Sequence, residues 1–148
     1  MSGKISADRG KRHERDMARE LSDIVPEGKV ITSRDGRGGA QGGADLLWLL
    51  EDGTKRPDVL GWSVECKTTA GRFPTHTTWR KWMVQAERDA SAVRVPTQSG
   101  GWMHSARPVV LYRQHGRRDC WAAVQAGDDV SLVPLDVWLR RVAREGEK

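Results

Sequence analysis

The chain has 148 residues, 30% of them charged, with a formal net charge of +5 and a pI near 9.6. This length suits one domain, so we expect residues 1–148 to form a single unit with a small core and a charged surface. No stretch approaches the ~20 apolar residues of a membrane span, and no secretory signal pattern begins the chain. Two cysteines far apart in sequence, Cys66 and Cys120, argue against a disulfide or a zinc site. We therefore expect a cytoplasmic protein.

Residues 8–25 have helical composition, and a proline and a glycine follow them. Four apolar residues recur at helical spacing along this segment: Met17, Leu21, Ile24 and Val25. One turn earlier, Glu14 falls on the same side, so we expect it to face the core. A lone glutamate in such a place is more often solvated and paired with arginine. Beside further carboxylates, Glu14 becomes a candidate site residue.

A short strand at 29–33 leads into a basic, glycine-rich loop at 34–43. The loop lacks the Gly-Lys-Ser/Thr of a nucleotide-binding loop, and no helix begins after it. Its arginines could instead contact nucleic acid, and a plain surface connection is an equally weighted interpretation. Ser33, Arg34 and Arg37 are the residues of this region that we consider for DNA contact.

Two strand-like segments carry the residues with the clearest chemistry. Asp45 opens the first, at 45–50, and the second, at about 60–68, contains Glu65 and Lys67. Because strand side chains alternate between faces, Glu65 and Lys67 should share one face. The opposite face is expected to pack into the core through Trp62, Val64 and Cys66.

An aspartate on one strand and Glu-x-Lys on the next suit metal-dependent phosphodiester cleavage. Mg²⁺ prefers oxygen ligands and usually takes one or two carboxylates together with several waters. Asp45 and Glu65 can supply these carboxylates, and the backbone carbonyl of Cys66 can add a third ligand. Lys67 would orient the attacking water or offset charge in the transition state, because neighbouring carboxylates keep its ammonium charged.

These residues resemble the PD-(D/E)XK nuclease superfamily, and within it the archaeal-type and phage-type Holliday junction resolvases. The resemblance covers roughly residues 10–112 and depends on Asp45 and on Glu65-Cys66-Lys67. It implies a restriction-endonuclease-like αβββαβ core with a mixed central sheet, here with an extra strand and a C-terminal helix. It also implies Mg²⁺ or Mn²⁺ as cofactor and Glu14 as a further metal ligand. The sequence departs from the family at Ala44, where a proline is frequent.

A literal Pro-Asp pair, Pro57-Asp58, competes with Asp45 for the metal site. Asp58 lies seven residues before Glu65, or about 23 Å along an extended strand, which is too far for one metal. The segment 51–58 is more typical of a hairpin connection, with Asp-Gly as its turn signal. We therefore favour Asp45.

The rest of the chain is expected to be mostly scaffold. A second helix capped by Thr77 or Thr78 should run to about residue 90, and the resemblance implies a catalytic role for its Gln85. Strands are predicted at 107–113 and 120–124, a long loop at 93–103 and a last helix at 133–144. If the strand of Val109 is parallel to that of Glu65, the second helix must be the crossover between them.

The charge and the acidic residues together favour a structure-selective DNA endonuclease, and the specific hypothesis is Holliday junction resolution. Two symmetric incisions in a four-way junction need two active sites, which implies a homodimer. Another nuclease of the same core (a nickase, a mismatch or a restriction-type enzyme) and a non-catalytic basic DNA-binding protein remain alternatives. The candidate DNA contacts are Arg12, Ser33, Arg34, Arg37 and Lys81.

Overall fold

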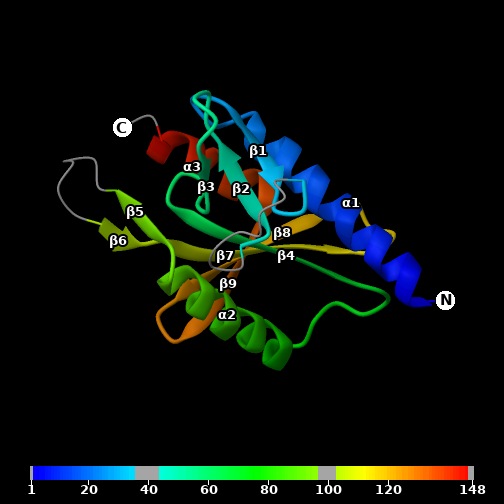
Figure 1. The fold of residues 1–148 in the computed structure, drawn as a ribbon. Helices are drawn as coiled ribbons and strands as arrows, with labels where there is room; N and C mark the ends of the chain where they lie inside the picture. The colour runs from blue at the N-terminus through cyan, green and yellow to red at the C-terminus, as the bar shows by residue number, and fades with distance from the viewer. Residues whose placement is uncertain (1, 36–43, 97–102, 147–148) are drawn as a thin grey trace.

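The computed structural model describes residues 2–35, 44–96 and 103–146 (Figure 1). Its helices are α1 (Ser2–Ser22), α2 (His76–Ser91) and α3 (Leu135–Gly146). Its strands are β1 (Lys29–Thr32), β2 (Leu46–Leu49), β3 (Lys55–Arg56), β4 (Trp62–Thr69), β5 (Arg94–Pro96), β6 (Met103–Ser105), β7 (Arg107–Gln114), β8 (Cys120–Ala126) and β9 (Asp129–Pro134).

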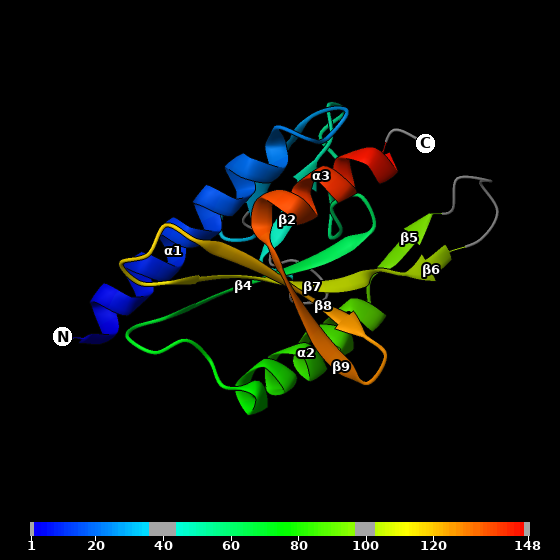
Figure 2. The same cartoon turned by 180° about the vertical axis from the view of Figure 1, so that it is seen from behind.

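A four-stranded mixed sheet in the order β4-β7-β8-β9 forms the centre of the fold. Strands β4 and β7 are parallel, with Glu65 opposite Val110, while β8 and β9 continue antiparallel. As expected, α2 lies in the connection between the two parallel strands. Helix α2 covers one face of the sheet and α1 with α3 cover the other (Figures 1 and 2). The chain is therefore a mixed α/β protein, as its sequence predicts.

The two faces of the central sheet have separate apolar cores. On one face, α1 and α3 pack with Trp62, Val64 and Cys66 of β4 around Trp138. On the other, Trp79, Met83 and Ala86 of α2 pack against Val110 and Tyr112 of β7. The alternation of β4 is thus confirmed, since its even-numbered side chains enter the first core and Glu65 lies on the opposite face.

A buried histidine ties α1 to the centre of the sheet. The Nε2 atom of His13 lies 2.8 Å from the carbonyl oxygen of Leu111 on β7. Burial lowers the pKa of His13 to about 4, so the ring is neutral at pH 7 and its Nε2–H donates to this carbonyl. Glu14 follows directly on the helix, so this contact also fixes the direction in which Glu14 points.

The sequence misplaced several elements. The first helix occupies Ser2–Ser22 rather than 8–25, and α2 is capped by Thr75, whose side chain accepts a hydrogen bond from the backbone N–H of Thr78, not by Thr77 or Thr78. Strand β9 was not expected, because we assigned its end to the last helix. Part of the region predicted as a loop pairs as the β5–β6 hairpin.

The three consecutive strands of the expected αβββαβ core are also divided between two sheets. Strands β1, β2 and β3 form their own antiparallel sheet, and β2 does not pair with β4 along its length. Among the described residues, a backbone hydrogen bond of 3.0 Å, from the N–H of Asp45 to the carbonyl of Val64, joins the two sheets instead. In the described part of the chain, no helix is both long and apolar enough to cross a membrane.

Candidate active site

Asp45 lies where β1, β2 and β4 come together. Its backbone carbonyl accepts a hydrogen bond of 2.8 Å from the N–H of Ser33, and its own N–H donates to Val64. Its side-chain Oδ2 accepts a hydrogen bond of 2.8 Å from the backbone N–H of Cys66. The Asp45 carboxylate therefore accepts a backbone hydrogen bond at the edge of β4 that a neighbouring strand would otherwise accept. This position is next to Glu65.

Glu65 is buried, with 7% of its surface exposed, and its Oε1 has no hydrogen-bond partner among the described residues. Burial, together with the adjacent carboxylates of Asp45 and Asp89, raises the pKa of Glu65 to about 9. Glu65 is thus protonated at neutral pH. This buried carboxyl oxygen lacks a hydrogen-bond partner in the described part of the chain and lies beside other carboxylates. A bound cation would therefore stabilise it.

Asp89 was missed by the sequence analysis. It is half-buried on α2, seven residues after Trp82, so both lie on the same side of the helix. The ring of Trp82 faces β4, because the Lys67 Nζ lies 6.0 Å from its centroid. Asp89 reaches Glu65 two turns further along the same helix edge. A carboxylate beside the buried stripe of Trp79, Met83 and Ala86 was the signal that could have revealed it.

Glu14 approaches the same region from α1, and only 8% of its surface is exposed. Its pKa is raised by burial and by the charge of Asp45, while Arg34 opposes this shift. The Nε of Arg34 donates to the Glu14 Oε2 at 3.3 Å. The prediction that Glu14 faces the core near Asp45 agrees with this placement, and its role as a metal ligand stays a prediction.

The remaining residues proposed for catalysis lie in different surroundings. Lys67 is half-buried between β4 and α2, while Gln85 is exposed. The thiol of Cys66 is buried in the α1 core, and burial raises its pKa well above the usual value. The thiol therefore points away from Glu65. The role that we predicted for Cys66 uses its backbone carbonyl and stays a prediction.

Asp58, the alternative to Asp45 as the metal-site aspartate, has a structural role. Its two carboxylate oxygens accept hydrogen bonds of 3.0 Å from the Nε and Nη2 of Arg56, and its Oδ2 also accepts one from the N–H of Gly61. These contacts organise the turn that leads into β4. Because every oxygen of this buried carboxylate is engaged, the geometry favours Asp45 over Asp58.

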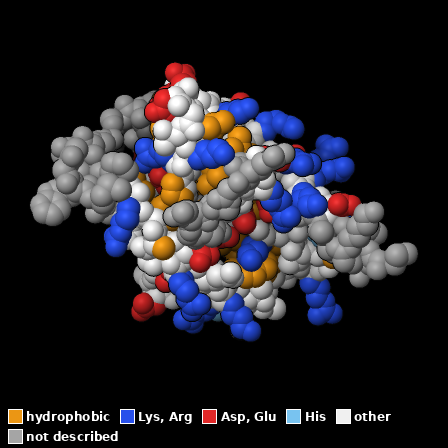
Figure 3. Space-filling model, viewed as in Figure 1, with side chains coloured by type: hydrophobic (Ala, Val, Ile, Leu, Met, Phe, Trp, Pro, Cys, Tyr) orange, Lys and Arg blue, Asp and Glu red, His pale blue; other side chains and the backbone are white. Residues whose placement is uncertain are grey.

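The described residues among the predicted DNA contacts lie on different elements, and their role stays a prediction. Arg34 pairs with Glu14 beside the site, Ser33 borders Asp45, and Lys81 is exposed on α2. Arg12 lies with Arg9 in a separate hollow, and Arg37 lies outside the described residues. Figure 3 shows acidic side chains near the middle of one face, with lysine and arginine side chains around them.

Within the described ranges, no group of three or more His, Cys, Asp and Glu side chains is arranged to hold a metal ion. Mg²⁺ does not require such a group, because it is commonly held by one or two carboxylates and several waters. The Glu65 Oε1, which has no hydrogen-bond partner among the residues described, and the neighbouring carboxylate of Asp45 are suitable as these one or two carboxylate ligands.

Comparison of the chain with family models, curated proteins and solved structures found no match. The chemistry of the site must therefore be inferred from its own residues.

Proposed function

We propose that the protein is a Mg²⁺- or Mn²⁺-dependent DNA endonuclease that acts on branched DNA, most specifically on Holliday junctions. One observation carries the proposal. The carboxylate of Asp45 is bound to the edge of β4 directly beside the buried, partner-less Oε1 of Glu65. The order of α1, β1, β2, β4, α2 and β7 is consistent with the PD-(D/E)XK core that the sequence resembles.

Asp45 and Glu65 would hold the cation, with Glu14 as a further ligand or as a group bound through water. When bound, the cation supplies positive charge to the phosphoryl oxygens and activates water. Asp45 is held in place by the Cys66 N–H, so its orientation does not depend on the cation. Glu65 must lose its proton before it can act as a ligand.

Lys67 shares the strand face of Glu65 and lies against Trp82. Its ammonium group would offset charge on the phosphate or orient the attacking water. A cation above an indole ring is restrained by the ring while its charge is retained. The contact with Trp82 therefore supports an electrostatic role for Lys67.

DNA as substrate is supported by charge. The net charge of +5 coexists with a cluster of carboxylates, so a polyanion needs a divalent cation to approach this acidic site. A nuclease of the same core with another substrate would use the same residues. A DNA-binding protein without catalysis would have no use for a buried Glu65 whose Oε1 has no partner among the described residues, beside the carboxylate of Asp45.

The decisive experiment is a cleavage assay on end-labelled four-way, nicked, flap and linear DNA, with and without Mg²⁺ or Mn²⁺. We expect cleavage that requires the metal and is fastest on the four-way junction. Glu65→Gln should abolish cleavage, while Glu51→Gln, on the exposed β2–β3 turn, serves as the matched control. Equal cleavage of all four substrates would favour a general endonuclease. No cleavage of any substrate with either metal would contradict the proposal.

A further inference from the structure

A second hollow lies at the N-terminal half of α1, where the β7–β8 turn passes beside the helix (Figure 2). Its volume is about 340 Å³, enough for a small anion with hydrating water. Three separate parts of the chain line it: α1, the end of β4 and the β7–β8 turn. The lining residues are Arg9, Arg12, Asp16, Thr68, Arg113, His115, Gly116 and Arg117.

The hollow is strongly basic. Of its four arginines, Arg113 is paired with Asp16 through a contact of 3.0 Å between Nη2 and Oδ2. Within the described part of the chain, no ion pair is formed by Arg9, Arg12 or Arg117. Three guanidinium groups from two elements therefore converge without a carboxylate to balance them. Such a cluster is stabilised by an anion, and the planar fork of arginine matches phosphate oxygens.

His115 adds a neutral group to the same hollow. Both of its ring nitrogens are shielded from water and lack a hydrogen-bond partner among the described residues. Burial and the charges of Arg9 and Arg113 lower its pKa, so the neutral ring offers one N–H donor. An anion oxygen that reached this ring would give the donor a partner.

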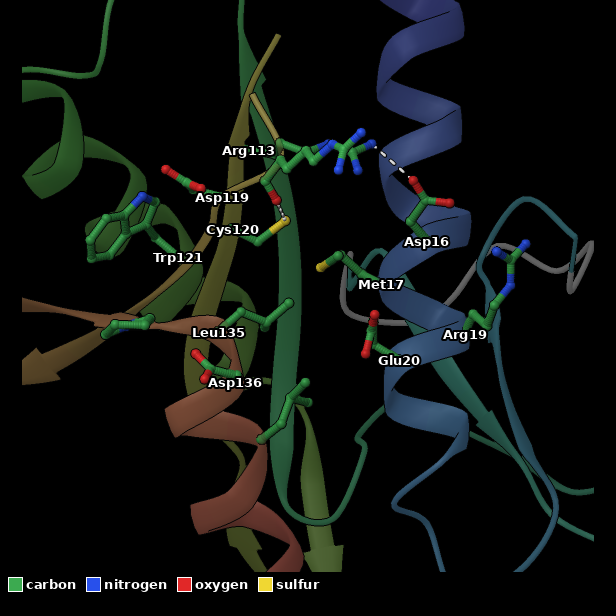
Figure 4. Close-up of a pocket in the computed structure, with 13 residues that line it drawn as sticks. Asp16, Met17, Arg19, Glu20, Arg113, Asp119, Cys120, Trp121, Leu135 and Asp136 are labelled. Carbon is green, nitrogen blue, oxygen red and sulfur yellow. Dashed lines mark hydrogen bonds and ion pairs between the residues drawn. The ribbon is translucent and has the colours of Figure 1, made fainter. Parts of the chain in front are cut away.

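The neighbouring cavity on α1 differs in character. It has a volume of about 530 Å³ and lies between α1, β8 and α3 (Figure 4). It shares Asp16 and Arg113 with the basic hollow, but there the further arginines, Arg19 and Arg118, are outnumbered by three carboxylates, Glu20, Asp119 and Asp136, and Leu135 and Leu139 form an apolar part. The unbalanced positive charge is thus specific to the smaller hollow.

The basic hollow is distinct from the candidate active site. Arg9, Arg12 and Asp16 follow one another at helical spacing along one side of α1. Glu14 falls on the other side, where it meets Arg34. The body of the helix, about 10 Å across, separates the two places, so an anion in the hollow is not the phosphate near Asp45.

We propose that the hollow between α1 and the β7–β8 turn is a phosphate-binding site, occupied by a backbone phosphate of a nucleic acid. The nucleic acid as source of the phosphate rests on the proposed function, whereas the anion site itself does not. The site fixes a phosphate away from the cleavage point, and it orients a DNA arm along α1 without reading its sequence.

Two measurements test the proposal, both in EDTA so that cleavage plays no part. In the first, inorganic phosphate is titrated into the isotopically labelled protein. We expect the amide resonances of His115, Gly116 and Arg117 to shift in the wild type and to stay unchanged in Arg117→Ala. Absence of any shift in the wild type would overturn the anion site.

In the second, the affinity for labelled duplex and four-way DNA is measured against salt. Arg117→Ala should weaken both by roughly fivefold to tenfold at 0.1 M salt and lower the slope of log affinity against log salt by about 0.9. The control is Arg80→Ala, on the exposed side of α2, which should change neither. Phosphate shifts without a DNA defect would overturn the nucleic acid as ligand. A DNA defect in a protein that does not cut DNA would support this site and contradict only the proposed cleavage.

Discussion

Glu65 brings a protonated carboxyl group to the candidate cation site at neutral pH. Burial raises its pKa to about 9, with Asp45 and Asp89 as further causes. A carboxyl must lose its proton to bind a cation, so the affinity for metal is coupled to pH. The carboxyl groups of Glu65, Asp45 and Asp89 together therefore determine the pH range in which the site can bind a cation.

This coupling predicts a pH-dependent metal affinity. Between pH 6 and 8, the affinity for Mn²⁺ should rise by up to about tenfold per pH unit, as one proton is displaced. Asp89→Asn removes a charge that raises the pKa of Glu65, so the dependence should become weaker. Calorimetric titration of Mn²⁺ at several pH values measures both effects, with Asp128→Asn on an exposed turn as control. A flat pH dependence in the wild type would contradict the assignment.

The same group predicts how stability changes with pH. The folded-state pKa of Glu65 lies above its unfolded value, so its contribution is fully present below about pH 4.5 and is lost as pH rises toward 9. His13 acts in the opposite sense, but only between about pH 4 and 6.5. Between pH 6.5 and 8.5, the wild type should lose about 1 to 3 kcal/mol relative to Glu65→Gln.

Urea unfolding of both proteins at the two pH values gives this difference directly. Glu51→Gln is the control, because Glu51 is exposed and should leave the wild-type pH dependence unchanged. Parallel pH dependences for the wild type and Glu65→Gln would show that Glu65 titrates normally.

At the scale of elements, α2 contacts both Lys67 and Glu65 of the candidate site. It begins at Thr75, whose Oγ1 accepts a hydrogen bond of 3.3 Å from the N–H of Thr78. It then presents Trp82 to Lys67 and Asp89 to Glu65 along one edge. The position of its first turn therefore fixes the register of both contacts.

Thr75→Ala should destabilise the protein by about 1 kcal/mol, because a backbone N–H at the helix start loses its partner. Thr77→Ala is the matched control, since Thr77 is exposed and does not cap the helix. Thermal or urea unfolding of the two variants measures the difference. An equal loss of stability in both variants would contradict Thr75 as the helix cap and would favour the cap predicted from the sequence.

The sequence predicts those elements whose signals are local. The apolar stripe of α1, the alternation of β4 and the crossover position of α2 were all apparent from spacing. Strand β9 was not, because apolar residues occur on both of its faces, with Val130 and Leu132 toward the α2 core and Val133 toward the other, and its last residues lead directly into α3. For Asp89, its place beside the buried stripe of α2 indicates only that it lies close to the sheet, because its nearness to Glu65 depends on how α2 crosses β4.

At the scale of the whole molecule, the proposed reaction requires two active sites. Symmetric incision of a four-way junction needs two copies related by a two-fold axis. Sedimentation equilibrium should therefore give a protein mass of twice 16.5 kDa, for the protein alone or, after the mass of the DNA is subtracted, for its complex with a four-way junction. A monomer under conditions that support paired incisions would contradict the dimer, although a monomeric nuclease of another specificity would still agree with the site.

The most direct test of the central claim is the rate of Mg²⁺-dependent cleavage of a labelled four-way junction by Asp45→Asn. Asparagine keeps the oxygen that accepts from the Cys66 N–H but removes the charge that would hold the cation. We expect the rate to fall by about a hundredfold or more, with DNA affinity in EDTA unchanged, and Asp52→Asn on the exposed β2–β3 turn to cut like the wild type. Wild-type cleavage by Asp45→Asn would show that Asp45 is not a catalytic carboxylate and would contradict the proposed pair of Asp45 and Glu65.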